Sequence, residues 1–258
     1  MKQAPKATAI IPARYASTRF PGKPLALIKG LPMIQHVCHQ VAKAETVDKV
    51  IVASDDERII SKVRAFGGEA VMTRVDHPTG TDRLAEVCER LDADLIVNVQ
   101  GDEPLIDPRM IDQAVQPLLD NPKLKMGTLA GRIDQIDDFF NPNVVKVVRD
   151  KSGLALYFSR APIPCPRGLS REKLAQQLDQ IALYRHIGLY VYRRDFLLSY
   201  PQLPQTPLET LECLEQLRAL ESGVDLYVAE TEFSSHGVDT PEDLERVSAL
   251  MSEEKLTS

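Results

Sequence analysis

A short basic loop near the N-terminus is the first segment that could carry chemistry. In IIPARYASTRFPGKPL, residues 10–25, the cations Arg14, Arg19 and Lys23 stand close together in the chain, with the hydroxyl of Ser17 between them. Cationic side chains and backbone N–H groups in a loop that leaves a strand suit the oxygens of a polyphosphate. Three prolines in the same segment reduce the conformational freedom that binding would remove. A solvated turn with ordinary surface cations is the alternative.

This loop does not match the common phosphate-binding motifs. Lys23 is followed by Pro24 and lacks an upstream glycine at Walker spacing, and no GxGxxG follows the first apolar run. The chain as a whole is acidic, with a net charge of −6 at pH 7, which argues against a nucleic-acid-binding protein. The cations are therefore a local feature that suits a small anion.

Two separate carboxylates could complete such an anion site through a metal ion. NVQGDEP, residues 98–104, places Asp102 and Glu103 directly after an apolar run. Carboxylates beside a phosphate site require a cation between them, and Mg²⁺ uses one or two carboxylates together with substrate oxygens. Asp239 precedes the helix cap at Thr240, so its carboxylate is available as a second ligand. A plain turn is the alternative for GDEP.

The N-terminal half contains the alternation that would position these loops. Short apolar runs alternate with amphipathic segments, and this rhythm predicts βαβ units with a mostly parallel sheet. The expected strands are 8–11, 49–54 and 94–100, and the expected helices are 32–44, 56–66 and 82–91. Ligands of such sheets bind beyond the carboxyl ends of the strands, where both candidate loops fall.

The second half predicts a change of architecture. Longer alternating segments indicate an antiparallel excursion at 143–150, 154–160 and 186–197, and 161–180 indicates a surface loop that leads into an irregular helix. Further on we expect a helix at 206–223, a strand at 225–230 and a helix at 238–251. The last helix has a capping box formed by Thr240 and Asp243, with Pro241 in its first turn. The expected fold class is α/β, with a Rossmann-like, mostly parallel central sheet flanked by helices and a smaller antiparallel part.

The cysteines and the hydropathy pattern predict a cytoplasmic protein. The spacing of the four cysteines fits neither a zinc site nor a disulfide framework, so buried reduced thiols are expected at Cys38, Cys88, Cys165 and Cys213. The first residues lack the apolar core of a signal peptide, and no run approaches the roughly 18 apolar residues of a membrane span.

Taken in order, eight segments resemble one enzyme family. They are IIPARYASTRFPGKPL, TGTDRLAEV, NVQGDEP, FNPNVVKVV, ALYFSRAPIP, RHIGLYVYRRDFL, PLETLECLEQLR and VDTPEDLERV. The set resembles the 3-deoxy-manno-octulosonate cytidylyltransferases, also called CMP-Kdo synthetases, from about residue 8 to residue 250. The opening loop alone is shared with other sugar-nucleotide transferases, whereas the ordered set is much more specific. The segment 161–180 matches least well.

The resemblance implies a single nucleotidyltransferase domain over residues 1–258 that makes CMP-Kdo and pyrophosphate from CTP and Kdo for lipopolysaccharide biosynthesis. It implies a nucleotide-binding half at about 8–130, a sugar-binding and dimerisation part at about 131–235, and a returning metal-ligand loop and helix at about 236–251. Members need Mg²⁺ and act as homodimers, and neither nucleic-acid binding nor membrane insertion is implied.

Carried over by motif, the resemblance also implies roles for individual residues. Those implied to hold CTP are Arg14, Ser17, Arg19, Lys23, Thr79, Gly80, Thr81, Arg83 and Gln100. Those implied to contact the sugar are Gln100, Ser159, Arg160, His186, Tyr190, Glu215 and Gln216. Lys23, Arg19 and Asp102 are implied to be catalytic, and Asp102 and Asp239 to bind the metal.

The residues themselves allow plainer interpretations. By position alone, His186 and Tyr190 could be structural, and Thr79 and Thr81 could cap a helix. Arg83 could pair with Glu86 on its own helix, and His77 could be an ordinary loop residue. Glu209, Glu212 and Glu215 are spaced three apart, which is typical of a solvated helix face, with Glu215 as the exception if it contacts the sugar.

Two alternative functions also stand. The same chemistry could act on 8-amino-Kdo or another 2-keto acid sugar, because only a few pocket residues would distinguish sugars that differ in a single group. A nucleotide-binding module without turnover belongs to a different class of protein. A module would bind CTP but release no pyrophosphate with any keto sugar acid.

Overall fold

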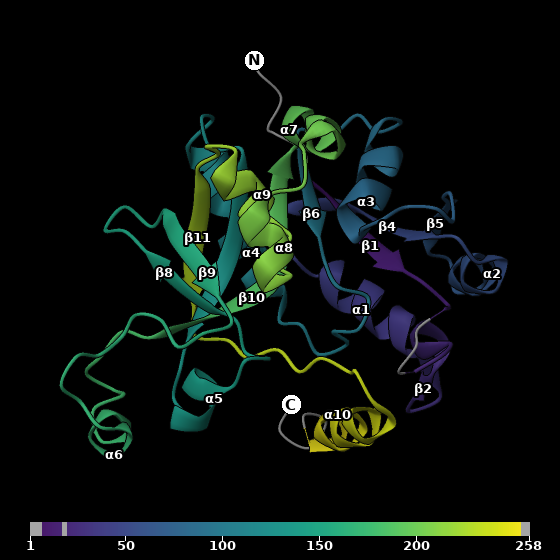
Figure 1. Cartoon of the computed structure of the whole chain (residues 1–258). Coiled ribbons are helices and arrows are strands. Elements are labelled where there is room, and N and C mark those ends of the chain that lie inside the picture. Colours follow the sequence, from purple (N-terminus) through teal and green to yellow (C-terminus); the bar gives the residue numbers. More distant parts are fainter. Residues whose placement is uncertain (1–6, 17–19, 254–258) are drawn as a thin grey trace.

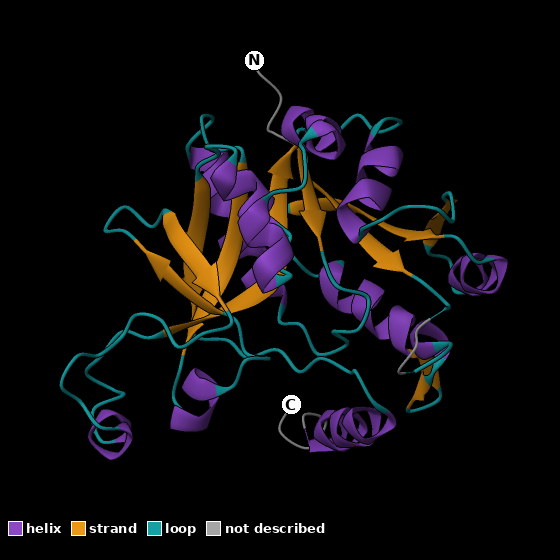
Figure 2. Cartoon of the chain, in the orientation of Figure 1, coloured by secondary structure: helices purple, strands orange, loops and turns teal. Residues whose placement is uncertain are grey.

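One mixed β-sheet runs through the centre of the protein, with helices on both of its faces (Figure 1, Figure 2). The computed structural model describes residues 7–16 and 20–253. The strands of the large sheet are β1 (Ala7–Ala13), β4 (Val47–Ser54), β5 (Glu69–Met72), β6 (Leu95–Asn98), β7 (Met126–Arg132), β8 (Lys146–Arg149), β9 (Ala155–Ser159), β10 (Tyr184–Arg193) and β11 (Leu226–Thr231). A small hairpin is formed by β2 (Leu27–Ile28) and β3 (Leu31–Pro32).

The helices connect these strands and cover the sheet. They are α1 (Met33–Val41), α2 (Glu57–Ala65), α3 (Gly80–Cys88), α4 (Pro108–Asp120), α5 (Ile136–Phe140), α6 (Arg171–Ala175), α7 (Arg194–Ser199), α8 (Pro207–Glu212), α9 (Gln216–Glu221) and α10 (Pro241–Glu253), with 3₁₀ turns η1 (Lys23–Leu25) and η2 (Tyr200–Gln202). None of the helices within residues 7–16 and 20–253 has both the length and the apolar character of a membrane span.

The strand order confirms the expected mostly parallel sheet with an antiparallel part. The order is β11-β7-β10-β6-β1-β4-β5, and β5, β4, β1 and β6 are all parallel. β10 enters antiparallel to both β6 and β7, and β11 is parallel to β7. The antiparallel hairpin of β8 and β9 branches from β10. The carboxyl ends of β1 and β6 therefore lie side by side.

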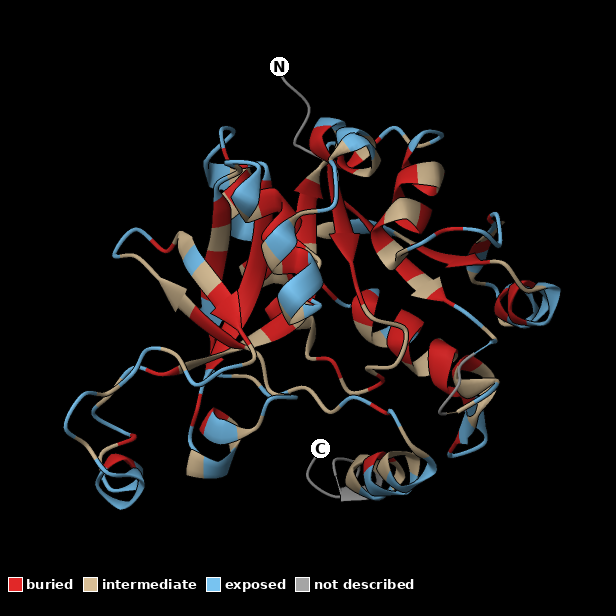
Figure 3. Ribbon diagram, in the orientation of Figure 1, coloured by how far each residue is buried: buried red, intermediate tan, exposed pale blue. Residues whose placement is uncertain are grey.

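The central strands are buried on both faces, which explains their continuous apolar runs (Figure 3). On β1, Ala9 and Ile11 pack in the cluster that contains apolar residues of α1, α2 and α4. Ile10 points to the opposite face and joins the cluster of α3, α7 and α9. The sheet is thus a middle layer between two layers of helices.

Two predicted elements differ from the structure. The helix expected at 206–223 is broken into α8 and α9, because Cys213 adopts left-handed backbone angles with φ 51° and ends α8. The two helices also differ in burial, since Leu217 on α9 is buried while Leu211 on α8 is 80% exposed. The strand expected at 186–197 ends at Arg193, where α7 begins.

The C-terminal segment returns across the molecule to the edge where β1 and β6 end (Figure 1). Ser235 donates a hydrogen bond to Glu103, and the N–H of Val238 donates to the carbonyl oxygen of Asp102 at 2.9 Å. Beyond it, the predicted capping box is confirmed, since the Asp243 N–H donates to Thr240 Oγ1 at 3.2 Å and the Thr240 N–H to Asp243 Oδ2 at 3.0 Å. These contacts place the loop before α10 on the loop after β6.

All four cysteines are free thiols, as expected, but only two of them are buried. Burial raises the pKa of Cys38 to about 12 and that of Cys88 to about 11, so both are protonated and unreactive at neutral pH. Cys165 and Cys213 are exposed, which corrects the expectation that all four lie in the core.

Candidate active site at the carboxyl ends of the parallel strands

Three residues from distant parts of the sequence meet where β1 and β6 end. Lys23 Nζ lies 2.6 Å from Asp102 Oδ2 and 3.3 Å from Asp239 Oδ1. Gly101 permits this approach, because a Cβ at that position would come within 2.9 Å of the carbonyl oxygen of Pro12 at the end of β1. The structure thus brings together the cation and both carboxylates that the sequence proposed for one site.

The same geometry fits a divalent metal ion. One ammonium nitrogen contacts both Asp102 and Asp239, so the two carboxylates can reach a single cation. Across residues 7–16 and 20–253, no group of three His, Cys, Asp or Glu side chains forms a ready-made cation site. Two carboxylates completed by water and phosphate oxygens is the coordination typical of protein-bound Mg²⁺, so the donor set fits this ion.

The predicted nucleotide loop lies at the N-terminus of α3. Thr79 caps this helix through a reciprocal pair of hydrogen bonds with Asp82, so the capping interpretation is confirmed. The Thr79 hydroxyl also lies 3.1 Å from Glu215 Oε1, and Arg14 Nη2 donates to the carbonyl oxygen of His77 at 2.8 Å. Through these contacts of His77 and Thr79, the nucleotide loop connects the basic loop after β1 with the start of α9.

Arg83 and its neighbours differ from the expectation. The guanidinium has no exposed surface and donates to Thr73 and, at 2.7 Å, to Asp55 Oδ2. The alternative interpretation that Arg83 pairs with Glu86 is wrong, because Glu86 instead bonds to the ring of His77. His77 is thus a buried, paired residue rather than an ordinary loop residue, and a direct contact between Arg83 and a nucleotide stays a prediction.

Two of the predicted phosphate-binding residues, Ser17 and Arg19, lie outside the described residues. Gln100 is described and follows β6, where its Nε2 donates to the carbonyl oxygen of Gly188 at 3.2 Å. Gly188 belongs to the irregular part of β10, so Gln100 stands between the parallel strands and the predicted sugar-binding part.

On β10, His186 and Tyr190 lie beside each other with ring centroids 5.4 Å apart. The Thr128 hydroxyl lies 2.7 Å from the carbonyl oxygen of Leu189 and 2.9 Å from His186 Nε2. Because a hydroxyl carries one hydrogen, a bond donated to Leu189 leaves it as an acceptor from His186 Nε2–H. Burial lowers the pKa of His186 to about 3, so the ring is neutral and its Nδ1 is a hydrogen-bond acceptor.

Glu215 and Gln216 stand at the start of α9, close to the nucleotide loop. Burial raises the pKa of Glu215, and hydrogen bonds from Thr81 and Thr79 oppose that rise. Gln216 is only 4% exposed, and its Nε2 finds no hydrogen-bond acceptor within the described part of the chain. An unpaired buried donor costs on the order of 1–3 kcal/mol, which a bound acceptor would offset.

The expectation of a solvated face on 206–223 is wrong for two of its glutamates. Glu209 is buried and forms an ion pair of 2.6 Å with Arg218. Glu212 accepts hydrogen bonds from Ser159 and from the main chain of Arg160, two of the residues predicted to contact the sugar. The spacing contained no signal for these roles, because the partners lie on other elements.

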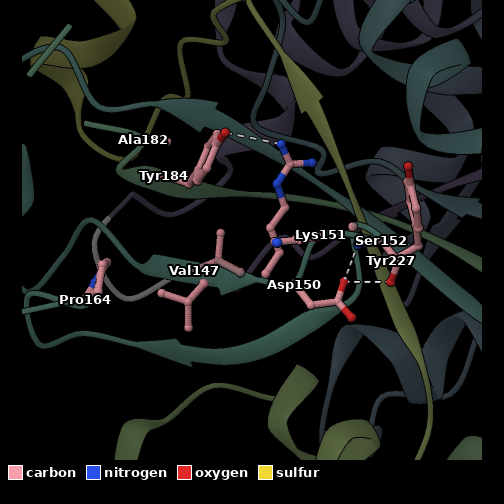
Figure 4. A pocket seen from close by; sticks show the side chains of 11 residues that line it. Val147, Asp150, Lys151, Ser152, Pro164, Ala182, Tyr184 and Tyr227 are labelled. Carbon is pink, nitrogen blue, oxygen red and sulfur yellow. Dashed lines mark hydrogen bonds between the residues drawn. The ribbon is translucent and has the colours of Figure 1, made fainter. Parts of the chain in front are cut away.

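A pocket of about 470 Å³ on the turn between β8 and β9 is separate from this cluster (Figure 4). Tyr184, Asp150 and Tyr227 are among its lining residues, and none of the predicted site residues lines it. Of its three charged groups, Arg149 bonds to Tyr184 and Asp150 bonds to Ser152, and Lys151 is exposed to solvent. Its chemistry therefore does not point to a reaction.

Comparison with known proteins defines the class of enzyme. The sequence pattern of the cytidylyltransferase family matches residues 8–226, so the chain belongs to that family and is a nucleotidyltransferase. It is 61% identical over 242 residues to the 3-deoxy-manno-octulosonate cytidylyltransferase of Syntrophotalea carbinolica, covering 94% of this chain and 97% of that one. Its identity to the enzyme of the same name from Trichlorobacter lovleyi is 58% over 247 residues, covering 94% and 97%.

A solved structure agrees with these relatives. CMP:2-keto-3-deoxy-manno-octonic acid synthetase, complexed with CTP, superposes with a TM-score of 0.89 at 46% identity, covering 96% of this chain and 99% of that chain. The resemblance based on eight segments is thereby confirmed, as is the predicted fold class.

Proposed function

We propose that this enzyme transfers the CMP group of CTP to Kdo, giving CMP-Kdo and pyrophosphate, a step that activates the acid sugar for lipopolysaccharide assembly. The observation that carries this proposal is the meeting of Lys23, Asp102 and Asp239 at the ends of β1 and β6. The 61% identity to a relative that is named for this reaction supports Kdo as the sugar. The CTP complex of the solved neighbour supports CTP as the nucleotide.

The proposed reaction is an in-line displacement at phosphorus. The anomeric hydroxyl of Kdo loses its proton to solvent as its oxygen forms a bond to the α-phosphorus of CTP. The bond from that phosphorus to the bridging oxygen breaks, and pyrophosphate leaves with its electron pair. Negative charge grows on the leaving oxygen and on the phosphoryl oxygens, so preorganised donors lower the barrier. Lys23 and Arg14, on the loop after β1, supply such donors.

We further propose that Asp102 and Asp239 hold Mg²⁺. When bound, the ion supplies positive charge beside the phosphate oxygens. Asp102, on the loop after β6, and Asp239, on the loop before α10, would hold the ion, while Lys23 donates from the loop after β1. Removal of divalent ions with EDTA is expected to abolish turnover, and added Mg²⁺ is expected to restore it.

For the sugar, we propose three different kinds of contact. Arg160 would face the carboxylate, because its planar fork matches two carboxylate oxygens. Gln216 Nε2 would donate to a sugar oxygen, and His186 Nδ1 would accept from a sugar hydroxyl. We also propose a homodimer, which the exposed apolar side chains of Leu156 and Leu211 support, and a cytoplasmic location.

The decisive experiment measures pyrophosphate release by the purified protein with Mg²⁺. Kdo, 8-amino-Kdo, sialic acid and no sugar are compared with CTP, and UTP and ATP replace CTP as nucleotide controls. Release with CTP and Kdo alone is the expected result. Preference for another acid sugar would change the substrate and keep the chemistry, whereas silence with every sugar would overturn the proposal in favour of a binding module.

A further inference from the structure

The main chain of Arg160 is held by two charged side chains of opposite sign. Its N–H donates to Glu212 Oε2 at 2.9 Å, and its carbonyl oxygen accepts from Lys146 Nζ at 2.7 Å. Hydrogen bonds to ionised groups are roughly twice as strong as bonds between neutral groups. Both bonds act on the backbone, so they fix the whole residue and not only its side chain.

Glu212, the last residue of α8, gathers the residues around Arg160. Its carboxylate accepts from the Ser159 hydroxyl at 2.6 Å and from the Tyr157 hydroxyl at 3.3 Å. Its carbonyl oxygen accepts from Arg160 Nε at 2.8 Å. Burial acts to raise the pKa of Glu212, but the bonds from Arg160, Ser159 and Tyr157 outweigh it and hold the pKa below its ordinary value.

Lys146, on β8, has no exposed surface and contacts Arg160 at its carbonyl oxygen, opposite the N–H that Glu212 accepts from. Its ammonium donates to the carbonyl oxygens of Asn141 at 2.8 Å, Val144 at 2.6 Å and Arg160 at 2.7 Å. An ammonium has three N–H donors, so these three bonds use all of them. Lys146 thereby ties the turn at 141–144 to the end of β9.

The guanidinium of Arg160 bonds to the same two segments. Nη1 donates to the carbonyl oxygen of Pro142 at 3.1 Å, and Nη2 donates to that of Cys213 at 3.4 Å. Within the described part of the chain, these bonds leave one N–H on each terminal nitrogen for another acceptor. An N–H on each terminal nitrogen can pair with one oxygen of a carboxylate.

We propose that Glu212 and Lys146 are positioning residues that hold Arg160 in the orientation that binds the carboxylate of the acid sugar, and so favour a sugar acid over a neutral sugar. This inference rests on the proposed function, in which Arg160 meets the Kdo carboxylate. Neither residue needs to touch the sugar, because each acts through Arg160.

The test compares the KM for Kdo with the KM for CTP in each variant. In Glu212→Gln, the amide can still accept from Ser159, but its NH₂ group faces the Arg160 N–H, where two donors repel. The KM for Kdo is expected to rise about ten-fold or more, while the KM for CTP stays within about two-fold. Lys146→Met is expected to act in the same direction, and Glu212→Asp is expected to give an intermediate KM for Kdo.

Matched controls are Glu45→Gln on the loop after α1 and Lys151→Met on the turn after β8, both at exposed positions away from Glu212 and Arg160. Both controls are expected to leave the two KM values unchanged. A folded Glu212→Gln protein with an unchanged KM for Kdo, or with equal rises in both KM values, would overturn the proposal. If Glu212→Gln does not fold, Glu212→Asp decides by the same comparison.

A second measurement does not depend on turnover. The Arg160 Nε–H signal in an NMR spectrum, assigned by its loss in Arg160→Lys, is expected to exchange slowly with solvent in the wild type and faster in Glu212→Gln. Equal exchange in both proteins would contradict the positioning role. If the wild type releases no pyrophosphate with Kdo, the proposed function fails, while this signal still decides whether Glu212 holds Arg160.

Discussion

At the scale of single residues, the contacts of Lys23 explain why the basic loop matters. Its ammonium lies 2.6 Å from Asp102 and 3.3 Å from Asp239, so it contacts both proposed metal ligands. A cation held beside two carboxylates is preorganised for the charge that develops on a triphosphate. It adds little to the core, because its side-chain partners are the half-exposed carboxylates of Asp102 and Asp239 rather than apolar core residues.

Replacement of Lys23 should therefore affect turnover far more than folding. Lys23→Ala is expected to lower kcat/KM by about 100-fold or more, because a preorganised donor to the transition state is lost. Melting temperature and kcat/KM are measured together. Lys49→Ala, which removes a surface lysine paired with Glu69, is the control and should change neither. A Lys23→Ala enzyme of normal rate would remove the loop from the mechanism.

The proposed role of Asp102 and Asp239 as metal ligands should appear in the Mg²⁺ dependence of pyrophosphate release. In Asp102→Asn and Asp239→Asn, an amide oxygen replaces a charged ligand, so the Mg²⁺ concentration for half-maximal pyrophosphate release should rise. Asp102 should show the larger effect, because it is 32% exposed against 51% for Asp239 and so lies in the drier place. Unchanged Mg²⁺ dependence in both variants would contradict the assigned metal site.

At the scale of elements, the break between α8 and α9 decides where the sugar-binding residues lie. A continuous helix would place Glu209, Glu212 and Glu215 on adjacent turns of one face. The left-handed angles at Cys213 instead redirect the chain, so Glu209 pairs with Arg218 while Glu212 turns towards Arg160. The break is thus the local feature from which this part of the site is built.

The conformation of Cys213 can be tested by substitution. Asparagine accepts left-handed angles readily, whereas a β-branched residue does not. Cys213→Val is expected to reduce the free energy of unfolding by about 1–2 kcal/mol, and Cys213→Asn to leave it nearly unchanged, measured by urea unfolding. Cys165→Val, at an exposed loop position, is the control. Equal stabilities of all the Cys213 variants would argue against a required left-handed residue.

At the scale of the whole molecule, folding keeps a partly buried histidine in its neutral form. Burial lowers the pKa of His186 from 6.5 to about 3. Between these values the unfolded chain binds a proton that the folded chain does not, so the free energy of unfolding rises with pH across this window. Stability should therefore fall as the pH drops from about 6.5 towards about 3, and should not depend on this residue above that window.

Urea unfolding at several pH values tests this dependence. His186→Gln should flatten the pH slope relative to the wild type, while His39→Gln, at an exposed position on α1, should keep it. Comparison of slopes removes the contribution of carboxylates that titrate in the same range in every variant. A His186→Gln protein with the wild-type slope would show that the buried ring is not responsible.

The local pattern of the sequence predicted β1, β4, β6 and the first three helices, as well as parts of the site, but it did not predict β5, α4 or β7. Strand and helix periodicity, the capping box at Thr240 and the loops after β1 and β6 depend on residues near one another in the chain, so they could be predicted. Because parallel strands place their carboxyl ends at one edge, Lys23 and Asp102 could also be expected at one site.

The remaining features depend on contacts between distant segments, which periodicity does not record. The sequence alone did not show that Arg83 pairs with Asp55, that Glu212 and Lys146 hold Arg160, or that α8 ends at Cys213. In each case a buried charge or a strained backbone is favourable only once a partner from another element arrives. Only the tertiary structure decides which partner that is.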